Sequence, residues 1–218
     1  MKVFIIIPCL NESLRLPEVI NSIKPFGQII VVDDGSWDNS YEVAKESGAI
    51  ALKHLVNRGM GAALETGDRY AYQHGADIAI HFDGDGQHLA QEIPSLIDPI
   101  ISGQADVVLG SRFLGKTTKT PWLKKWLIFK PLIPIHNLFL GVKLTDAHNG
   151  FRALSRQALG LINLQQDRYA HATEIIYQIK KNKLKYIEVP VTIRYYEFGL
   201  GVRGGLQILR DLFLGIFK

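Results

Sequence analysis

Short apolar runs recur along the first half of the chain, and polar or glycine residues come directly after each run. The runs span residues 3–7, 28–32, 49–54, 78–82 and 106–110. Runs of this length suit strands that are buried on both faces of a parallel sheet. The segments between them carry helix signals, with Asn11 or Ser13 as a first cap, Ser36 or Asp38 as a second start, and Gly48 as a stop. This alternation predicts an α/β fold with a mainly parallel central sheet flanked by helices, built as one domain over residues 1–218.

Polar side chains gather where these predicted strands end. In open α/β sheets, ligands bind beyond the carboxyl ends of the strands. Polar residues at several strand ends are much stronger evidence for a binding site there than any single motif. The residues concerned are Asn11, Asp33, Asp34, Arg58, Asp83, Asp85 and Arg112.

The hexapeptide from Asp83 to His88 is the strongest of these strand ends. Two carboxylates this close repel one another, and a cation between them would relieve the repulsion. Gln87 adds a neutral oxygen at the next alternate position, and hard oxygen ligands suit Mg²⁺ or Mn²⁺. The alternative is a polar turn that caps the next helix. An EF-hand loop fits poorly, because no Glu occupies its twelfth position.

The second half is less regular. Pro121, Pro131 and Pro134 interrupt an apolar region, so we expect broken helical pieces there. Beyond it we expect a polar turn at 146–152, a helix at 169–181 and a strand at 185–194. Pro190 within that strand places it at a sheet edge or strand end.

Composition restricts the partners. A net charge of +4 and an isoelectric point near 9.1 favour anionic partners. The basic residues are scattered rather than aligned in a stripe, which argues against nucleic-acid binding. Cys9 is the single cysteine, so no intramolecular disulfide forms and a reducing compartment fits. Its place after an apolar strand indicates a small core residue rather than a nucleophile.

Two apolar segments suggest contact with a membrane surface. Neither residues 122–142 nor the C-terminal stretch 204–218 reaches the roughly 18 uncharged apolar residues that a spanning helix needs. The second segment carries its apolar residues at helical spacing, so it could lie in the interface, bind a membrane-protein partner or pack on its own core. We therefore expect a cytoplasmic protein, peripheral at the inner face of the membrane and without a transmembrane helix.

Arginines at other turns suggest phosphate binding. Arg58, Arg112, Arg152 and Arg203 all stand in turns, and guanidinium forks bind phosphate bidentately. Each of them alone is more often a surface residue than a phosphate ligand. A dinucleotide fingerprint is incomplete, because Leu64 stands where its third glycine would be, and no P-loop is present.

The ordered series of these motifs resembles glycosyltransferase family 2, and within it the branch of dolichyl-phosphate mannose synthase and bacterial polyprenyl-phosphate glycosyltransferases. The resemblance covers about residues 3–195. The motifs are Pro8 with Asn11-Glu12, Asp33-Asp34-Gly35-Ser36, Asn57-Arg58-Gly59, Asp83 to His88, Gly110-Ser111-Arg112, Asp146 with Asn149 to Arg152, and Glu188-Val189-Pro190-Val191.

The resemblance implies a GT-A fold that binds a nucleotide diphosphate sugar, a divalent cation (Mg²⁺ or Mn²⁺) and inversion at the anomeric carbon. It also implies a role for individual residues. Those assigned to the nucleotide are Pro8, Asn11, Glu12, Asp34, Arg58 and Asp83; those assigned to the metal are Asp83, Asp85 and Gln87; Asp85, Arg112 and Arg152 would serve catalysis, with the two arginines facing phosphates.

Three functions remain open from the sequence. The first is sugar transfer to a polyprenyl phosphate of the dolichyl or undecaprenyl type, an anionic acceptor that needs no general base. The second is transfer to a saccharide hydroxyl in cell-surface polysaccharide assembly, for which Asp146 is the candidate base. The third is a nucleotide-sugar-binding subunit that has no catalytic activity. The intact pair of Asp83 and Asp85 argues against it.

Overall fold

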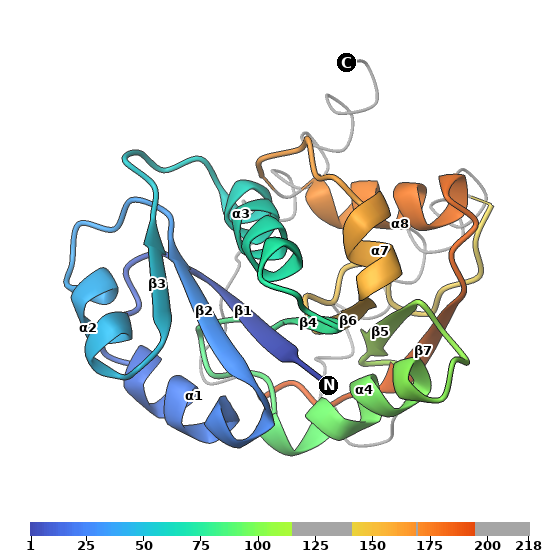
Figure 1. The fold of residues 1–218 in the computed structure, drawn as a ribbon, viewed down its shortest axis with the longest axis horizontal. Coiled ribbons are helices and arrows are strands. Elements are labelled where there is room, and N and C mark those ends of the chain that lie inside the picture. The colour runs from blue at the N-terminus through green and yellow to red at the C-terminus, as the bar shows by residue number, and fades with distance from the viewer. Residues whose placement is uncertain (115–140, 169, 195–218) are drawn as a thin grey trace, which may run out of the picture.

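The computed structural model describes residues 1–114, 141–168 and 170–194, and these build one seven-stranded sheet (Figure 1). The strand order is β3-β2-β1-β4-β6-β5-β7. All neighbouring strands run parallel except β6, which is antiparallel to both β4 and β5. The strands are β1 (Val3–Cys9), β2 (Gln28–Asp33), β3 (Ile50–Lys53), β4 (Ile78–His81), β5 (Val107–Ser111), β6 (Arg152–Ser155) and β7 (Tyr186–Pro190).

Helices cover both faces of the sheet, as Figure 1 shows. On one face lie α1 (Leu16–Ile23), α2 (Ser40–Glu46) and α4 (Ile93–Ile101). On the other lie α3 (Met60–Gln73), α7 (Arg156–Leu161) and α8 (His171–Lys181). Two short 3₁₀ turns, Lys24–Phe26 and Ala90–Glu92, precede β2 and α4. The predicted α/β class is confirmed.

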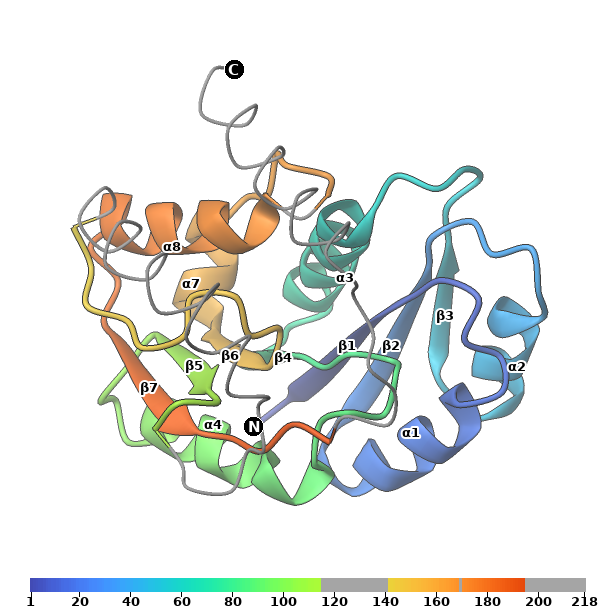
Figure 2. The ribbon, with the colours of Figure 1, turned by 180° about the vertical axis from the view of Figure 1, so that it is seen from behind.

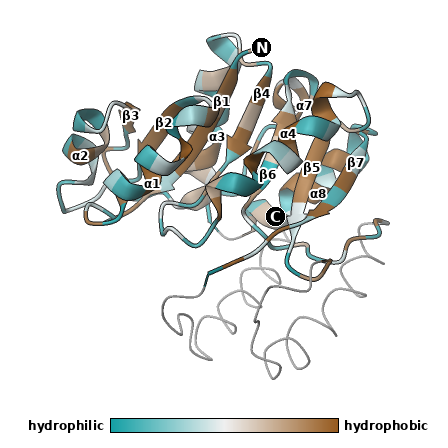
Figure 3. Ribbon diagram, turned by 90° about the horizontal axis from the view of Figure 1, so that it is seen from below, coloured by the Kyte–Doolittle hydropathy of each residue, from teal (hydrophilic) through white to brown (hydrophobic). Residues whose placement is uncertain are grey.

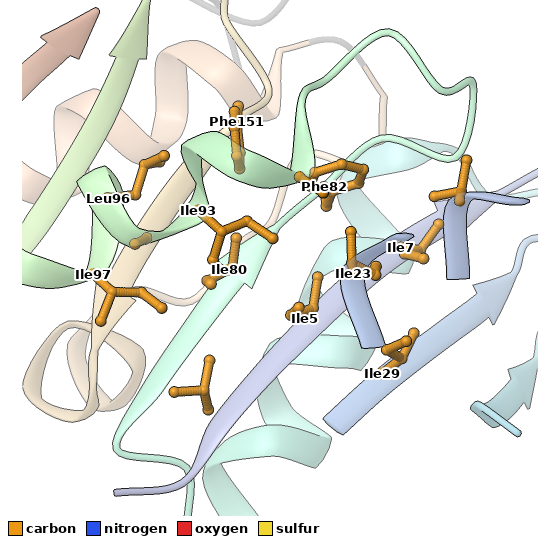
Figure 4. Packing of buried hydrophobic residues seen from close by; sticks show 14 of the residues in the cluster. Ile5, Ile7, Ile23, Ile29, Ile80, Phe82, Ile93, Leu96, Ile97 and Phe151 are labelled. Carbon is orange, nitrogen blue, oxygen red and sulfur yellow. The ribbon is translucent and has the colours of Figure 1, made fainter. Parts of the chain in front are cut away.

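The apolar strands divide their side chains between the two helical layers. Ile5 and Ile7 of β1 pack with Ile23 of α1, whereas Phe4 and Ile6 belong to the core under α3 (Figure 4). All four β1 side chains are buried. A strand covered on both faces has no polar side to show, which explains the continuous apolar runs of the sequence. Figure 3 shows the resulting hydrophobic strands between helices of mixed polarity.

The close packing of α3 on β1 depends on a glycine. A Cβ at Gly67 would lie 2.3 Å from Ile6 Cγ2, a distance that real contacts do not tolerate. The helix that leads away from β3 is thereby held tightly over β1, and its first turn lies at the edge where β1 ends.

The sequence does not predict β6. A turn is expected over residues 146–152, but Arg152 already belongs to a strand inserted between β4 and β5. Because β6 runs antiparallel, its first residue meets the last residue of β4: Arg152 is in register with His81. The predicted edge position of Pro190 is confirmed, since Pro190 closes β7 at the border of the sheet.

Several predicted helix starts are wrong. Helix α1 begins at Leu16 without a side-chain cap from Asn11 or Ser13, because the carbonyl of Glu12 accepts the free N–H groups of Arg15 and Leu16. Helix α2 begins at Ser40 rather than at residue 36 or 38. Ser36 Oγ and Asp38 Oδ2 accept N–H groups of the neighbouring loop after β1, and Asp38 Oδ1 accepts the N–H of Ser40 at the start of α2.

Both segments predicted to contact a membrane fall largely or wholly outside the described residues, which include only 141–142 of the segment 122–142 and none of 204–218. Within the described ranges, no helix is long and apolar enough to cross a bilayer.

Candidate active site

A cavity of about 360 Å³ opens at the edge of the sheet where β1, β2 and β4 end. Five residues predicted from three separate motifs line it together: Pro8, Glu12, Asp34, Asp83 and Asp85. The other predicted site residues are not among its lining: Asn11, Arg58, Gln87, Arg112, Asp146 and Arg152. Residues at or just after the ends of β1, β2 and β4 therefore meet at one cavity, whereas the remaining candidates lie outside its lining.

Asp34 shapes one wall of the cavity. Its Oδ1 accepts hydrogen bonds from His54 Nδ1 at 2.7 Å and from the backbone N–H of Arg58 at 3.0 Å. Its Oδ2 accepts one from the backbone N–H of Gly59 at 2.6 Å. Gly59 has a φ of +112° and lies against the Asp167 carbonyl, 2.4 Å from where a Cβ would be, so only glycine fits. The buried carboxylate thus fixes the loop that leads into α3.

Two residues predicted to bind the nucleotide lie beside the cavity. The Arg58 side chain is half exposed and meets Asp167 at 3.4 Å. Asn11, with a left-handed φ of 58°, joins two loops: its backbone N–H donates to Ser36 Oγ and its Oδ1 accepts from the Trp37 N–H. Their predicted contact with a nucleotide stays a prediction.

Asp83 is oriented by a histidine. His88 Nε2 lies 3.0 Å from Asp83 Oδ2, and the His88 ring is buried against Phe82 and Phe151. Gly150 lies on the other side, where a Cβ would come within 2.8 Å of the same oxygen. Burial alone would raise the pKa of Asp83, but the positive charge and hydrogen bond of His88, together with Arg152, outweigh it and lower that pKa. Asp83 is therefore held in place and ionised.

Asp85 is in the opposite situation. Its Oδ1 accepts a hydrogen bond from the Gln87 N–H at 2.9 Å, yet burial and the nearby charge of Asp83 raise its pKa. Burial also raises the pKa of Glu12, with the charge of Asp85 adding to the effect. Glu12, Asp83 and Asp85 thus line the cavity together with Asp34, and the negative charges of Asp83 and Asp85 disfavour further ionisation beside them.

These carboxylates fit a divalent cation that is shared with a ligand. A cation at the cavity would relieve the repulsion between Asp83 and Asp85. In residues 1–114, 141–168 and 170–194, no three His, Cys, Asp or Glu side chains group to hold a metal by themselves. Mg²⁺ is commonly bound by one or two carboxylates plus the phosphates of a substrate, and this donor set is of that kind. Gln87 contacts Asp85 and Arg194 through its backbone, and its side chain is not part of the cavity lining.

Arg112 and Asp146 form a fork-to-fork ion pair. Arg112 Nε lies 2.6 Å from Asp146 Oδ2, and Nη2 lies 2.7 Å from Oδ1. The Arg112 backbone N–H also donates to Oδ2. Asp146 is buried, and its own N–H donates to Glu188. Both carboxylate oxygens of the candidate base are therefore engaged with one guanidinium group.

Arg152 lies buried behind Asp83. Its Nε and Nη2 donate to the Asn149 carbonyl at 3.0 and 2.8 Å, and its Nη1 has no partner among the described residues. Burial lowers its pKa to about 10, with the carboxylates of Asp83 and Asp146 opposing that shift. The guanidinium acts on the cavity through its charge on Asp83.

Several cavity residues are not predicted by the sequence. Arg168 lines the cavity from the loop before α8, about 85 positions after Asp83, and nothing in its local sequence marks it. Met60 and Ala63 line it from the first turn of α3, and His54 supports it through Asp34. For His54 a signal exists, since it comes directly after the third strand, where the strand-end rule applies.

Comparisons with known proteins agree with this geometry. The family model for glycosyl transferase family 2 matches residues 4–161. The chain is 37% identical to the UDP-N-acetylglucosamine–dolichyl-phosphate N-acetylglucosaminyltransferase of Methanococcus voltae, over 97% of this chain and 95% of that enzyme. It is 29% identical to the polyprenol monophosphomannose synthase of Mycolicibacterium smegmatis, over 97% and 84%.

A solved structure supports the fold. Glucosyl-3-phosphoglycerate synthase from Mycobacterium tuberculosis, solved with Mn²⁺, uridine diphosphate and phosphoglyceric acid, superposes with a TM-score of 0.78. The match covers 99% of this chain and 77% of that one at 20% sequence identity, which is evidence for the GT-A fold and for nothing finer.

Proposed function

The chain belongs to glycosyltransferase family 2, and we propose that it moves a sugar from a nucleotide diphosphate sugar to a polyprenyl phosphate. The observation that carries the proposal is the cavity in which Asp34, Asp83 and Asp85 meet. The names of the relatives from Methanococcus voltae and Mycolicibacterium smegmatis, which specify dolichyl phosphate and polyprenol, support the choice of acceptor.

Each side of the cavity has a role in holding the donor. Pro8, Glu12 and the loop fixed by Asp34 would enclose the nucleoside, with Gly59 allowing the backbone to approach it closely. Asp83 and Asp85 would hold Mg²⁺ or Mn²⁺ together with the diphosphate. When bound, the cation would offset the charge that builds on the leaving nucleoside diphosphate.

The transfer itself needs little acid–base chemistry. An oxygen of the acceptor phosphate attacks the anomeric carbon as the bond from that carbon to the nucleoside diphosphate oxygen breaks, and the configuration inverts. Because the acceptor is already anionic, no side chain has to remove a proton. Arg112, held by Asp146, would steer the acceptor phosphate, and Arg152 would maintain the ionised state of Asp83 from behind.

Transfer to a saccharide hydroxyl finds less support. That reaction needs a base, and the candidate Asp146 has both oxygens committed to Arg112. Because the proposed acceptor is a lipid phosphate, we also propose that the enzyme acts at the surface of the membrane that carries this lipid, on its cytoplasmic face.

The decisive test uses the purified chain with Mn²⁺ or Mg²⁺, radiolabelled UDP-, GDP- and dTDP-sugars, and undecaprenyl or dolichyl phosphate in detergent. The expected product is an organic-extractable, lipid-linked sugar that forms only with the cation present. A chain that binds a donor and yet glycosylates only saccharides would contradict the acceptor assignment. Thermal shifts with each donor identify the base beforehand, since a ligand of the native state raises the midpoint.

A further inference from the structure

Four large apolar side chains protrude at the cavity edge of the sheet, and no described residue covers them. Leu55 is 100% exposed, Leu14 95%, Trp37 86% and Val56 67%. They stand on the loops after β1, β2 and β3, three neighbouring strands (Figure 2). We call Leu14, Trp37, Leu55 and Val56 the loop-tip patch. Exposed apolar residues scattered singly need no explanation, whereas a group on adjoining loops marks an interaction surface.

The three loops touch one another, so the patch residues stand on one connected group of loops. The loop after β1 is tied to the loop after β2 by the bond from the Ser13 N–H to Asp38 and by the bond from the Trp37 N–H to Asn11. The loop after β2 packs on the loop after β3 at Gly35, where a Cβ would lie 2.8 Å from the Asn57 nitrogen. These contacts fix the loops that carry the patch, and its apolar side chains still point to solvent.

The patch continues to the mouth of the donor cavity. Leu10 and Met60 are partly exposed, and both line the cavity. Leu10 precedes the loop that carries Leu14, and Met60 comes after the loop that carries Leu55 and Val56. Whatever covers the patch therefore lies against the opening through which substrates pass.

The chemistry of the patch suits a lipid surface. Its side chains protrude separately from loop tips rather than lining a groove, as insertion between lipid head groups requires. Tryptophan favours the boundary between head groups and acyl chains. Arg15 is exposed beside the patch, and basic side chains at a membrane surface are attracted to anionic lipids.

We propose that the loop-tip patch inserts into the interfacial layer of an anionic bilayer and sets the donor cavity against the membrane. This rests on the proposed function, because a polyprenyl phosphate presents its phosphate at that surface. The surface is distinct from the segments 122–142 and 204–218, which the sequence suggests for membrane contact. The loops beside the donor cavity would then face the membrane.

Vesicle binding tests the proposal directly. The full chain is mixed with vesicles of phosphatidylcholine with phosphatidylglycerol, and bound protein is measured by flotation. We expect Trp37→Ser and the double variant Leu55→Ser/Val56→Ser each to weaken binding by about tenfold. Ile101→Ser is the matched control, since Ile101 is 56% exposed at the end of α4 and its loss is expected to leave binding unchanged.

Depth of insertion gives a second readout. Brominated lipids quench tryptophan fluorescence at close range, and the chain has three tryptophans, so the quenching lost in Trp37→Phe reports Trp37 alone. Strong quenching of Trp37 is expected. Unquenched Trp37 together with wild-type flotation of the serine variants would overturn the proposal. If these substitutions disrupted a dimer of the chain or a protein complex and left flotation unchanged, the patch would be a protein interface, and the proposal would be overturned.

Activity separates this proposal from the proposed function. The serine variants should keep donor binding and transfer to a short-chain, water-soluble polyprenyl phosphate, and lose about tenfold in rate with acceptor embedded in vesicles. If the wild type transferred no sugar to any lipid phosphate but its flotation still depended on the patch, only the proposed function would be wrong. If the variants and the wild type had equal rates on vesicles, only the proposed membrane role of the patch would be wrong.

Discussion

The guanidinium of Arg112 holds both carboxylate oxygens of Asp146, at 2.6 Å from Nε and 2.7 Å from Nη2. Asp146 is buried and Arg112 nearly so, with side-chain exposures of 2% and 14%. The pair joins the end of β5 to the loop before β6. A residue named from the sequence as a possible base thus has, in the folded chain, both carboxylate oxygens bound by Arg112, the arginine that we propose steers the acceptor phosphate.

Asp146→Asn should therefore act on stability and on Arg112 together. Removal of one partner leaves a poorly solvated charge, so we expect a loss of about 3 kcal/mol in the free energy of unfolding, measured by urea denaturation. The exposed Asp77→Asn is the control. A variant with wild-type stability, a turnover lowered 100-fold or more and a missing acidic limb in its pH–rate profile would instead identify Asp146 as a general base.

Asp85→Ala should abolish metal-dependent donor binding and leave the fold intact. At a nucleotide concentration of 100 times the dissociation constant, the wild type gains about 2.7 kcal/mol from binding, which a thermal shift detects. In the variant, the difference between shifts with and without Mn²⁺ should vanish. Asp98→Ala removes an exposed carboxylate from α4 and should behave as the wild type. An undiminished Mn²⁺ effect in Asp85→Ala would refute the assignment.

Gly150→Ala should damage the site without a change of charge. The new Cβ would lie 2.8 Å from Asp83 Oδ2 and 3.0 Å from Oδ1, so the carboxylate must move. We expect at least tenfold weaker binding of nucleotide with Mn²⁺, by calorimetry, because a carboxylate displaced from its position binds a metal poorly. Gly160→Ala serves as a control, since its Cβ meets only the Tyr72 ring, at 3.2 Å. An unaltered affinity for nucleotide with Mn²⁺ in Gly150→Ala would show that binding does not depend on the observed position of the Asp83 carboxylate.

His171 should make the fold sensitive to acid. Burial, reinforced by Arg152, lowers its pKa to about 4 from an ordinary value of 6.5. Between these values the unfolded chain binds the proton and the native chain does not, so stability is complete above pH 6.5 and falls as the pH drops toward 4. The loss is about 3 kcal/mol.

His171→Asn keeps a donor for the Arg168 carbonyl, which His171 Nδ1 meets at 2.6 Å, and removes the titration. Urea denaturation at a series of pH values should give a flatter profile for this variant than for the wild type. His74→Asn, at an exposed position, controls for the loss of a histidine in general. A wild-type slope in His171→Asn would assign the acid sensitivity to other groups.

The acidic residues of the site could be placed from the sequence, whereas one of its arginines could not. Asp34, Asp83 and Asp85 belong together because the carboxyl ends of parallel strands share one edge of a sheet. The position of Arg152 depends on β6 being inserted antiparallel between β4 and β5, which no local pattern predicts. The pairing with β4 brings Arg152 opposite His81, where it is buried and lowers the pKa of Asp83. Its predicted contact with a phosphate stays a prediction.

Arg168 and the loop-tip patch show a second limit. Arg168 reaches the cavity only because the loop before α8 folds back onto α3, where the Asp167 carbonyl accepts the Gly61 N–H. Leu14, Trp37 and Leu55 look like ordinary apolar residues in the sequence, and only the folded chain reveals that nothing among the described residues covers them.

The sequence by itself determined the strand–helix alternation, the α/β class, the edge of the sheet that carries the site and the acidic residues on it. These depend on periodicity and on the residue types at the end of each apolar run, which are local properties. Only the tertiary structure decided which oxygen meets which nitrogen: that Asp146 is bound by Arg112, that Arg152 is buried, and that His88 orients Asp83. Such pairings join residues from separate strands and loops, and their energies depend on burial and distance, which a linear sequence does not contain.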